Sequence, residues 1–439
     1  MKKMKIMGAL IITAMVLINC ASTASFKDVP PSAGTAFVCL PINVWIDHVD
    51  GERVLWVEKT RHEIAAGAHQ LSVGFRYSDV YTIYSATDII LNGIFTEGKS
   101  YYVIPSVKRG KVYLNLVETS EQPQNQITLP NYKAPAFSYT QPRYSPDGSM
   151  LLVNYKNILY IYNVNDGMLV KTLTGHSKEV TTGLWSPDGT KIISGDQSGA
   201  IIIWDVSSGS EVRSIRGNKG PVSFAGLKIT PDGAKILGNG GDILKIWDIN
   251  DGSELFVSEK IYRWGANSFF TLSPDGQYFA ATFDDNTLRV YSINGGLPIF
   301  RIAGEKRTRY FPFEFIDGNT LIAVYCEPIR IYSNPEQVSI DIKSNRTTKF
   351  ESEYIPRTNL SNYNYDGSKV FSQKTTVAGN GIYYFIQAAD AKTGDTVSAF
   401  SSPRVDIISF DVSPVENKVA GFTHGEGKIR FWDFGSSEN

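Results

Sequence analysis

Short apolar runs alternate with polar turns along most of the chain, and from Tyr139 to Asn439 they follow one repeated order. Each repeat contains an apolar run, a turn of the Ser-Pro-Asp-Gly type, two more apolar runs, a Trp-Asp-like dipeptide, a polar turn and a short fourth run. The runs are rich in β-branched residues and are bounded by turn residues, as in the stretch from Ala200 to Trp204. This pattern is typical of buried β-strands, so each repeat predicts four strands.

Two markers share the period of the repeat. An Asp in the turn recurs at steps of 41 to 49 residues, and a dipeptide follows each turn. The turn positions are Asp147, Asp188, Asp232, Asp275, Asp317 and Asp366, with Glu416–Asn417 in the seventh place. The dipeptides are Tyr162–Asn163, Trp204–Asp205, Trp247–Asp248, Tyr291–Ser292, Tyr332–Ser333, Ala389–Asp390 and Trp432–Asp433. A shared period of about 40–45 residues indicates blades, which are four-stranded sheets that stack around an axis.

The repeats in residues 126–434 resemble those of the Trp-Asp (WD) repeat family. The resemblance implies an all-β fold with a seven-bladed β-propeller. In the family, a His, a Ser or Thr, an Asp and the Trp make a buried hydrogen-bonded set. The second repeat offers His176, Ser194 and Trp204, but Ser198 stands where the Asp is expected. We therefore expect this set to be incomplete.

The seventh repeat lacks a fourth run of its own, because only five residues follow Phe434. The segment Gln126–Pro130 has the form of the earlier fourth runs, such as Lys171–Gly175, and no third run precedes it. We expect 126–130 to be the outer strand of the seventh blade, where it covers an edge that would otherwise be open.

A small antiparallel β-sandwich-like domain is expected in residues 26–118, before a polar linker at 119–125 and a propeller at 126–439. Its apolar runs are Thr35–Asp47, Arg53–Glu58, Gln70–Tyr77, Ile89–Phe95, Tyr101–Ser106 and Val112–Val117. An Asp50–Gly51 turn, a Gly-x-His-x-Leu run ending at Leu71 and a Gly-x-x-Tyr-Tyr run resemble small bacterial envelope domains.

Residues 1–25 have the features of a secretory signal, with three lysines before an apolar run from Ile6 to Ile18. The run is shorter than the ~20 apolar residues that span a bilayer. The Leu-Ile-Asn-Cys sequence that ends at Cys20 resembles a bacterial lipobox. This resemblance implies lipidation of Cys20 and a lipid-anchored protein of the bacterial cell envelope, at the outer membrane or the periplasmic face. The alternatives are a soluble secreted or periplasmic protein cleaved after Ala24, and an uncleaved anchor.

Charge and reactive residues narrow the function classes. The 43 basic and 44 acidic residues balance, with no polybasic tract, so nothing favours a nucleic-acid partner. Cys39 and Cys326 lie in strand-forming runs and are expected to be buried free thiols. The spacings of His48, His62 and His69 match no metal signature, so we expect packing or surface roles, and neither a metal nor a cofactor.

The sequence contains no Gly-x-Ser-x-Gly elbow, His-Glu-x-x-His pair or Cys-x-x-Cys pair. The resemblance to WD repeats implies a non-catalytic scaffold that binds protein partners, here unidentified. A periplasmic propeller enzyme or a small-ligand sensor at the channel mouth is the alternative, because some propellers use residues around their central channel.

Basic and aromatic residues recur in the connections from each fourth run to the next repeat, which the repeat geometry places at one end of the blades. Arg, Trp and Tyr are enriched in binding hot spots. The turn Asp residues lie at the opposite end, while acidic residues such as Asp284 and Asp285 partly offset the basic ones. The candidate partner-binding face comprises Arg263, Trp264, Arg307, Arg309, Tyr310 and Arg357.

Overall fold

The computed structural model describes most of the chain. The described residues are 4–5, 35–39, 44–53, 61–78, 82–95, 100–108, 111–120, 125–133, 139–215, 220–222, 226–264, 267–268, 270–305, 308–327, 336–349, 361–363, 368–378, 381–390, 396–400 and 407–434. Across these ranges the chain is all-β and contains no helix. It divides into two compact units, one of Met1–Ala134, Glu353–Val412 and Asn417–Asn439, the other of Pro135–Ser352 and Ser413–Glu416.

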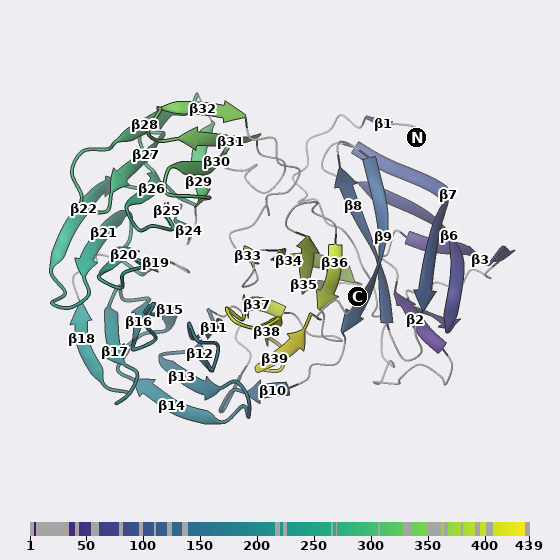
Figure 1. Cartoon of the computed structure of the whole chain (residues 1–439), viewed down its shortest axis with the longest axis horizontal. Coiled ribbons are helices and arrows are strands. Elements are labelled where there is room, and N and C mark those ends of the chain that lie inside the picture. The colour runs from purple at the N-terminus through teal and green to yellow at the C-terminus, as the bar shows by residue number, and fades with distance from the viewer. Residues whose placement is uncertain are drawn as a thin grey trace. The chain divides into compact units, whose positions relative to one another are not determined.

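The second unit contains five consecutive four-stranded antiparallel sheets, which we call blades one to five. Their strands are β11 (Pro142–Tyr144), β12 (Met150–Tyr155), β13 (Ile158–Asn163) and β14 (Leu169–Thr174); β15 (Val180–Trp185), β16 (Lys191–Asp196), β17 (Ile201–Asp205) and β18 (Glu211–Ile215); β19 (Leu227–Ile229), β20 (Lys235–Asn239), β21 (Ile243–Asp248) and β22 (Glu254–Lys260); β25 (Phe270–Leu272), β26 (Tyr278–Thr282), β27 (Thr287–Ser292) and β28 (Phe300–Ala303); β29 (Arg309–Phe315), β30 (Thr320–Cys326), β31 (Glu336–Asp341) and β32 (Arg346–Lys349). In each blade the first strand lies innermost and the fourth outermost (Figure 1).

Neighbouring blades are held together by shared apolar cores. Leu152 and Ile161 of blade one pack in one buried cluster with Ile192 and Trp204 of blade two. Similar clusters join blades two and three, three and four, and four and five. Both faces of a blade that lies between two others are therefore apolar. For this reason its strands contain continuous buried runs, and apolar and polar residues do not alternate along them. Full burial of one apolar side chain of these cores, such as Leu152 or Ile192, stabilises the fold by roughly 1.5–3 kcal/mol.

The turn Asp that marks each repeat has a local structural role. In the turn between β15 and β16, the carboxylate of Asp188 accepts hydrogen bonds from the Ser186 hydroxyl at 2.5 Å and the Thr190 amide at 3.0 Å. These bonds, that of Ser186 first, lower the pKa of Asp188 to about 2. Gly189 has a φ of 70°, a conformation that favours glycine. The turn Asp therefore recurs with the repeat because it stabilises the turn between the first two strands of a blade.

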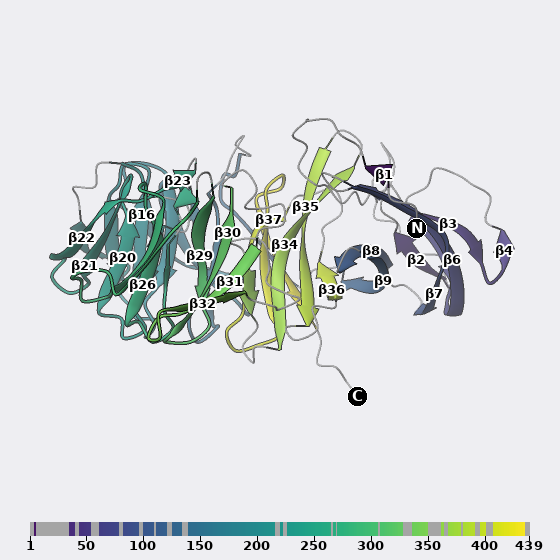
Figure 2. The ribbon, with the colours of Figure 1, turned by 90° about the horizontal axis from the view of Figure 1, so that it is seen from above.

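The later repeats belong to the first unit. Strands β33 (Ser361–Tyr363), β34 (Lys369–Ala378), β35 (Gly381–Asp390) and β36 (Thr396–Phe400) form one end of an eight-stranded sheet. Strands β37 (Ile407–Val412), β38 (Lys418–Thr423) and β39 (Lys428–Asp433) form a second sheet with β10 (Asn125–Thr128). Strands β34 and β35 lie beside β37 (Figure 2), and a core that contains Phe371, Ile386 and Trp432 fills the interface.

Strand β10 occupies the outer position beside β39. It is antiparallel to β39, with Ile127 opposite Ile429 and Thr128 opposite Lys428. The Leu129 amide extends the pairing by donating to the Gly427 carbonyl at 2.9 Å. Ile127 and Leu129 are each 2% exposed, so this segment is bound by burial as well as by its backbone. The sheet thereby joins chain segments that are about 300 residues apart.

The N-terminal region contributes strands to two sheets of the first unit. One sheet has the order β1-β7-β6-β3-β4, and the other adds β9, β8, β2 and β5 to β36. The strands are β1 (Met4–Lys5), β2 (Thr35–Cys39), β3 (Val44–Val49), β4 (Glu52–Arg53), β5 (Arg61–Ala65), β6 (Gly67–Ser78), β7 (Thr82–Phe95), β8 (Ser100–Lys108) and β9 (Lys111–Ser120).

Pairing in this region differs from the antiparallel arrangement expected from the sequence. The run expected at 35–47 is divided into β2 and β3, which lie in different sheets. Strand β2 is parallel to β8, and β36 is parallel to β9 at Thr119 and Ser120, so β9 ends inside the segment expected as linker. The parallel partners are distant in the chain, and the apolar pattern of a strand does not specify its partner. Strand β9 covers an edge of β36 that would otherwise be open.

Candidate functional site

The structure describes only part of the candidate partner-binding face. Arg263 and Trp264 form the two-residue strand β23, which pairs with β24 (Asn267–Ser268) in a small hairpin before blade four. Arg309 and Tyr310 begin β29 of blade five. The other candidates, Arg307 and Arg357, and the lipidation candidate Cys20 lie outside the described residues.

Arg309 is stacked on an aromatic ring from the preceding connection. Its guanidinium lies 4.1 Å from the centroid of the Tyr262 ring and donates a hydrogen bond to the Phe283 carbonyl oxygen at 3.2 Å. The Tyr262 amide donates to the carbonyl of Thr282 on β26, which fixes the backbone below the ring. A cation over an aromatic face contributes about 0.5–2 kcal/mol. Two successive inter-blade connections are thus held together at one end of blades four and five.

Tyr310 makes a second aromatic pair next to this contact. Its ring stacks on that of Tyr325 with centroids 4.4 Å apart. The Thr308 hydroxyl donates to the Tyr325 hydroxyl at 2.6 Å, and the Thr282 hydroxyl donates to the Tyr310 carbonyl at 2.7 Å. All three rings, including Tyr262, are half-buried. Each of these residues is therefore partly accessible to solvent and is held in place by packing.

Sequence analysis identified Arg309 and Tyr310 but missed their partners Tyr262 and Tyr325. Tyr262 immediately precedes Arg263, so an aromatic residue beside a basic one was a signal within the same connection. Tyr325 gives no such signal, because it lies within the apolar run of β30 and opposes Tyr310 only through strand pairing.

Blade two contains a complete buried polar set, which corrects the expectation that the set lacks its Asp. His176 Nδ1 lies 3.0 Å from a carboxylate oxygen of Asp196, and its Nε2 lies 2.6 Å from the Ser194 hydroxyl oxygen. The Trp204 indole donates to the same hydroxyl at 2.8 Å. The expected Asp position was Ser198, but the Asp stands two residues earlier, at the end of β16. From there its other oxygen also accepts the Ser198 hydroxyl and amide.

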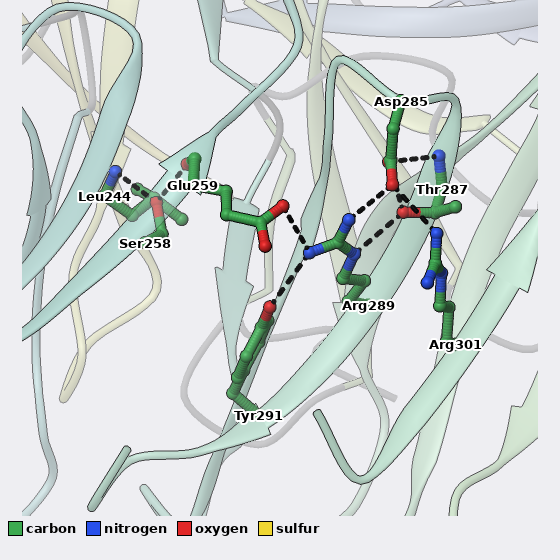
Figure 3. Close-up of polar contacts among 8 residues, drawn as sticks. All are labelled: Leu244, Ser258, Glu259, Asp285, Thr287, Arg289, Tyr291 and Arg301. Carbon is green, nitrogen blue, oxygen red and sulfur yellow. Dashed lines mark hydrogen bonds and ion pairs between the residues drawn. The ribbon is translucent and has the colours of Figure 1, made fainter. Parts of the chain in front are cut away.

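Blade four replaces this set with a network around Arg289 (Figure 3). Thr287, Arg289 and Tyr291 alternate along β27, so they share one face of the strand. The Arg289 guanidinium bonds to the Thr287 hydroxyl at 2.9 Å and pairs with Asp285 in the preceding turn. It also pairs at 2.9 Å with Glu259, which belongs to the outer strand of blade three.

The negative charge of Asp285 offsets the positive charges of two arginines. Arg301 of β28 stands directly opposite Arg289, an arrangement in which like charges repel. The Asp285 carboxylate accepts from both guanidinium groups. Burial raises the pKa of Asp285, but hydrogen bonds from Thr287 and Arg289 outweigh it, so the pKa is lowered on balance. The side chain of Arg289 is 7% exposed and that of Arg301 is 57% exposed, so only Arg289 is buried.

His69 and Cys326, two of the potentially reactive residues in the sequence, have surroundings that the structure describes. His69 Nδ1 lies 2.5 Å from Asp50 Oδ2, and the Gln70 amide donates to the other Asp50 oxygen, so His69 locks the Asp50–Gly51 turn against β6. Burial raises the pKa of the Cys326 thiol to about 12.

The described residues contain no group of three side chains suited to hold a metal ion. No helix in the described ranges is long and apolar enough to cross a membrane.

Comparisons with known proteins agree with this architecture. Residues 167–205 and 266–292 match the family described as "WD domain, G-beta repeat". An uncharacterized WD repeat-containing protein of Synechocystis is 33% identical over 116 residues, which are 26% of this chain and 32% of that protein. Small ribosomal subunit protein RACK1 of Caenorhabditis elegans is 26% identical over 163 residues, 35% of this chain and 49% of that protein. The matches thus span about a third to a half of these relatives.

A solved structure resembles the fold over a larger part of the chain. The β-propeller domain of Cps50 (Swd1) from Myceliophteria thermophila has a TM-score of 0.52 and 16% sequence identity. The alignment covers 70% of this chain and 99% of that one. The chain therefore contains WD repeats and has a β-propeller fold.

Proposed function

We propose that this chain is a non-catalytic scaffold that binds a protein partner at the candidate face. The observation that carries the proposal is the pair of cation–aromatic and aromatic contacts of Arg309 and Tyr310 at one end of blades four and five. The WD repeats support it, because proteins built from them typically act as interaction scaffolds.

The fixed rings suit this function energetically. Arg and Tyr dominate interface hot spots, and side chains already ordered by packing lose little conformational entropy on binding. Both tyrosines are held through their backbones by Thr282: the Tyr262 amide donates to its carbonyl, and its hydroxyl donates to the Tyr310 carbonyl. The basic residues Arg263 and Arg309 would favour an acidic or polar partner and accelerate its association.

The proposed architecture is a seven-bladed propeller at 126–439 behind a small β-sandwich-like domain at 26–118, with 119–125 between them. Blades one to five and the sheets containing β33–β36 and β37–β39 supply seven repeats. Strand β10 completes the last sheet as its fourth strand.

The proposed location is the bacterial cell envelope, with the protein anchored by lipid on Cys20. Cleavage before Cys20 would remove β1, which pairs with β7 through two residues. Because a lipidated N-terminus is the proposed membrane attachment, Cys20→Ala is expected to release the protein into the soluble envelope fraction. Fractionation with a high-salt wash tests this. Retention of the variant with the membranes would contradict the lipid anchor.

Replacing Arg263 and Trp264 together with Ala is expected to weaken partner capture by about 10-fold or more, since both a charge and an aromatic anchor are lost. The partner is captured from detergent-solubilised envelopes with full-length protein, and the melting temperature is measured in parallel. Lys343→Ala is the control, because Lys343 is exposed in the turn between β31 and β32, at the opposite end of the blades. Equal capture by a well-folded double variant and the control would place the binding site elsewhere.

A further inference from the structure

Arg309 at the start of β29 is a half-buried arginine whose charge is not offset by a carboxylate. Its guanidinium lies over the Tyr262 ring and donates from Nη1 to the Phe283 carbonyl oxygen. Asp284 follows that carbonyl in the chain, yet within the described ranges neither its carboxylate nor any other forms an ion pair with Arg309. In blade four, by contrast, Arg289 is paired with two carboxylates.

One edge of the Arg309 guanidinium is open to solvent. Its hydrogen bond to the protein uses Nη1, while Nε and Nη2, which form another edge, bond to nothing in the described part of the chain. Neither atom is among the buried nitrogens that lack a partner, so both reach solvent. An arginine edge with two parallel N–H groups fits the two oxygens of a carboxylate.

Arg309 stands at the end of a small apolar cluster. Cys326 of β30 is directly opposite Arg309, and Phe311 is two residues further along β29, so the three side chains share one face of blade five. Cys326 and Phe311 are buried in one cluster, and Tyr262 packs against it. The ring and the cluster keep water from one side of the guanidinium, and an ion pair formed there is stronger than one fully in water.

We propose that Arg309 binds a Glu or Asp carboxylate of the protein partner through its Nε and Nη2 atoms, with the Tyr262 ring against its face. This inference rests on the proposed scaffold function and deepens it, because it assigns a direct contact where charge alone would only attract the partner. The ring and the Phe283 carbonyl already hold the guanidinium in place. Arg309 therefore loses little conformational freedom when the carboxylate binds.

Binding of two labelled peptides to the full-length protein tests this contact. Hexaglutamate and hexaglutamine, both with amidated C-termini, are titrated at constant ionic strength and followed by fluorescence anisotropy. The wild type is expected to bind hexaglutamate saturably, and hexaglutamine about 10-fold or more weakly. Arg309→Lys is expected to bind hexaglutamate about 10-fold more weakly than the wild type, because lysine keeps the charge but lacks the paired donors.

Arg346→Lys is the matched control, since Arg346 is exposed on β32 of the same blade and should leave the binding of hexaglutamate unchanged. The proposal is overturned if the wild type does not prefer hexaglutamate, or if Arg309→Lys binds it as tightly as the wild type. Neither result would refute the scaffold function, which is tested separately by partner capture with the Arg263 and Trp264 double variant.

Melting temperatures are measured in parallel, so that a folding defect is recognised. If Arg309→Lys melts well below the wild type, Tyr262→Phe and Tyr262→Leu take its place. Phe keeps a ring against the guanidinium and should retain the affinity for hexaglutamate, whereas Leu should lower it by about 3-fold or more. Equal affinities of these two variants would overturn the proposal.

Discussion

Replacing Ile127 with Asp is expected to destabilise the protein by on the order of 4 kcal/mol, the largest effect we expect from a single substitution. The Ile127 side chain is 2% exposed and stands opposite Ile429, which is fully buried. The substitution would remove the apolar contacts and place a carboxylate without a partner in the core. Loss of β10 would then expose the edge of β39 to pairing with other chains. Urea unfolding followed by tryptophan fluorescence measures the change.

Thr128→Asp is the control for this experiment. Thr128 is the next residue of the same strand, faces solvent and stands opposite Lys428. A carboxylate there should change stability by no more than ~0.5 kcal/mol. Similar destabilisation by both variants would mean that Asp disfavours the strand itself, and that burial of Ile127 is not what binds β10 to the sheet.

The repeated sheets could be predicted from the sequence because their strongest signals are local. Ser186 and Asp188 are two residues apart and bond to each other, so the turn is specified by a segment that can be read directly. The buried runs reflect blades covered on both faces. The parallel pairing of β2 with β8 could not be predicted, because those strands are about 60 residues apart and their composition does not encode the partner.

The polar set of blade two was misjudged for a specific reason. Asp196 and Ser198 are neighbours of one turn, and spacing alone does not show which side chain points back at His176. Strand β16 extends through Asp196, and this extension aims the carboxylate at the imidazole. The choice between the two residues depends on where a strand ends, which the sequence pattern defines poorly.

The Arg289 network was missed because its members come from three strands and a turn. Glu259 is 30 residues from Arg289, and the network contains no Trp or His that would mark it as equivalent to the set in blade two. Yet both networks join the end of the preceding blade to the turn between the second and third strands, through His176 in one and Glu259 in the other. In both cases a polar network therefore joins the two blades at this place, with different residue types.

Replacing Arg289 with Ala is expected to cost about 2–3 kcal/mol, which is below the usual range for breaking a buried ion pair because Glu259 is 74% exposed and can be rehydrated. The loss includes the contact of the guanidinium with the Phe283 ring, 4.4 Å from its centroid. Arg301→Ala is the matched control, since Arg301 pairs with the same Asp285 oxygen from an exposed position. It should cost at most about 1 kcal/mol.

Salt distinguishes the two arginines further. Because exposed charges are screened and buried ones much less so, 1 M NaCl should abolish the small effect of Arg301→Ala but leave most of that of Arg289→Ala. Urea unfolding of both variants at low and high salt measures this. If Arg289→Ala costs no more than Arg301→Ala, or if salt removes both effects equally, the network is a set of surface ion pairs and does not hold blade three to blade four.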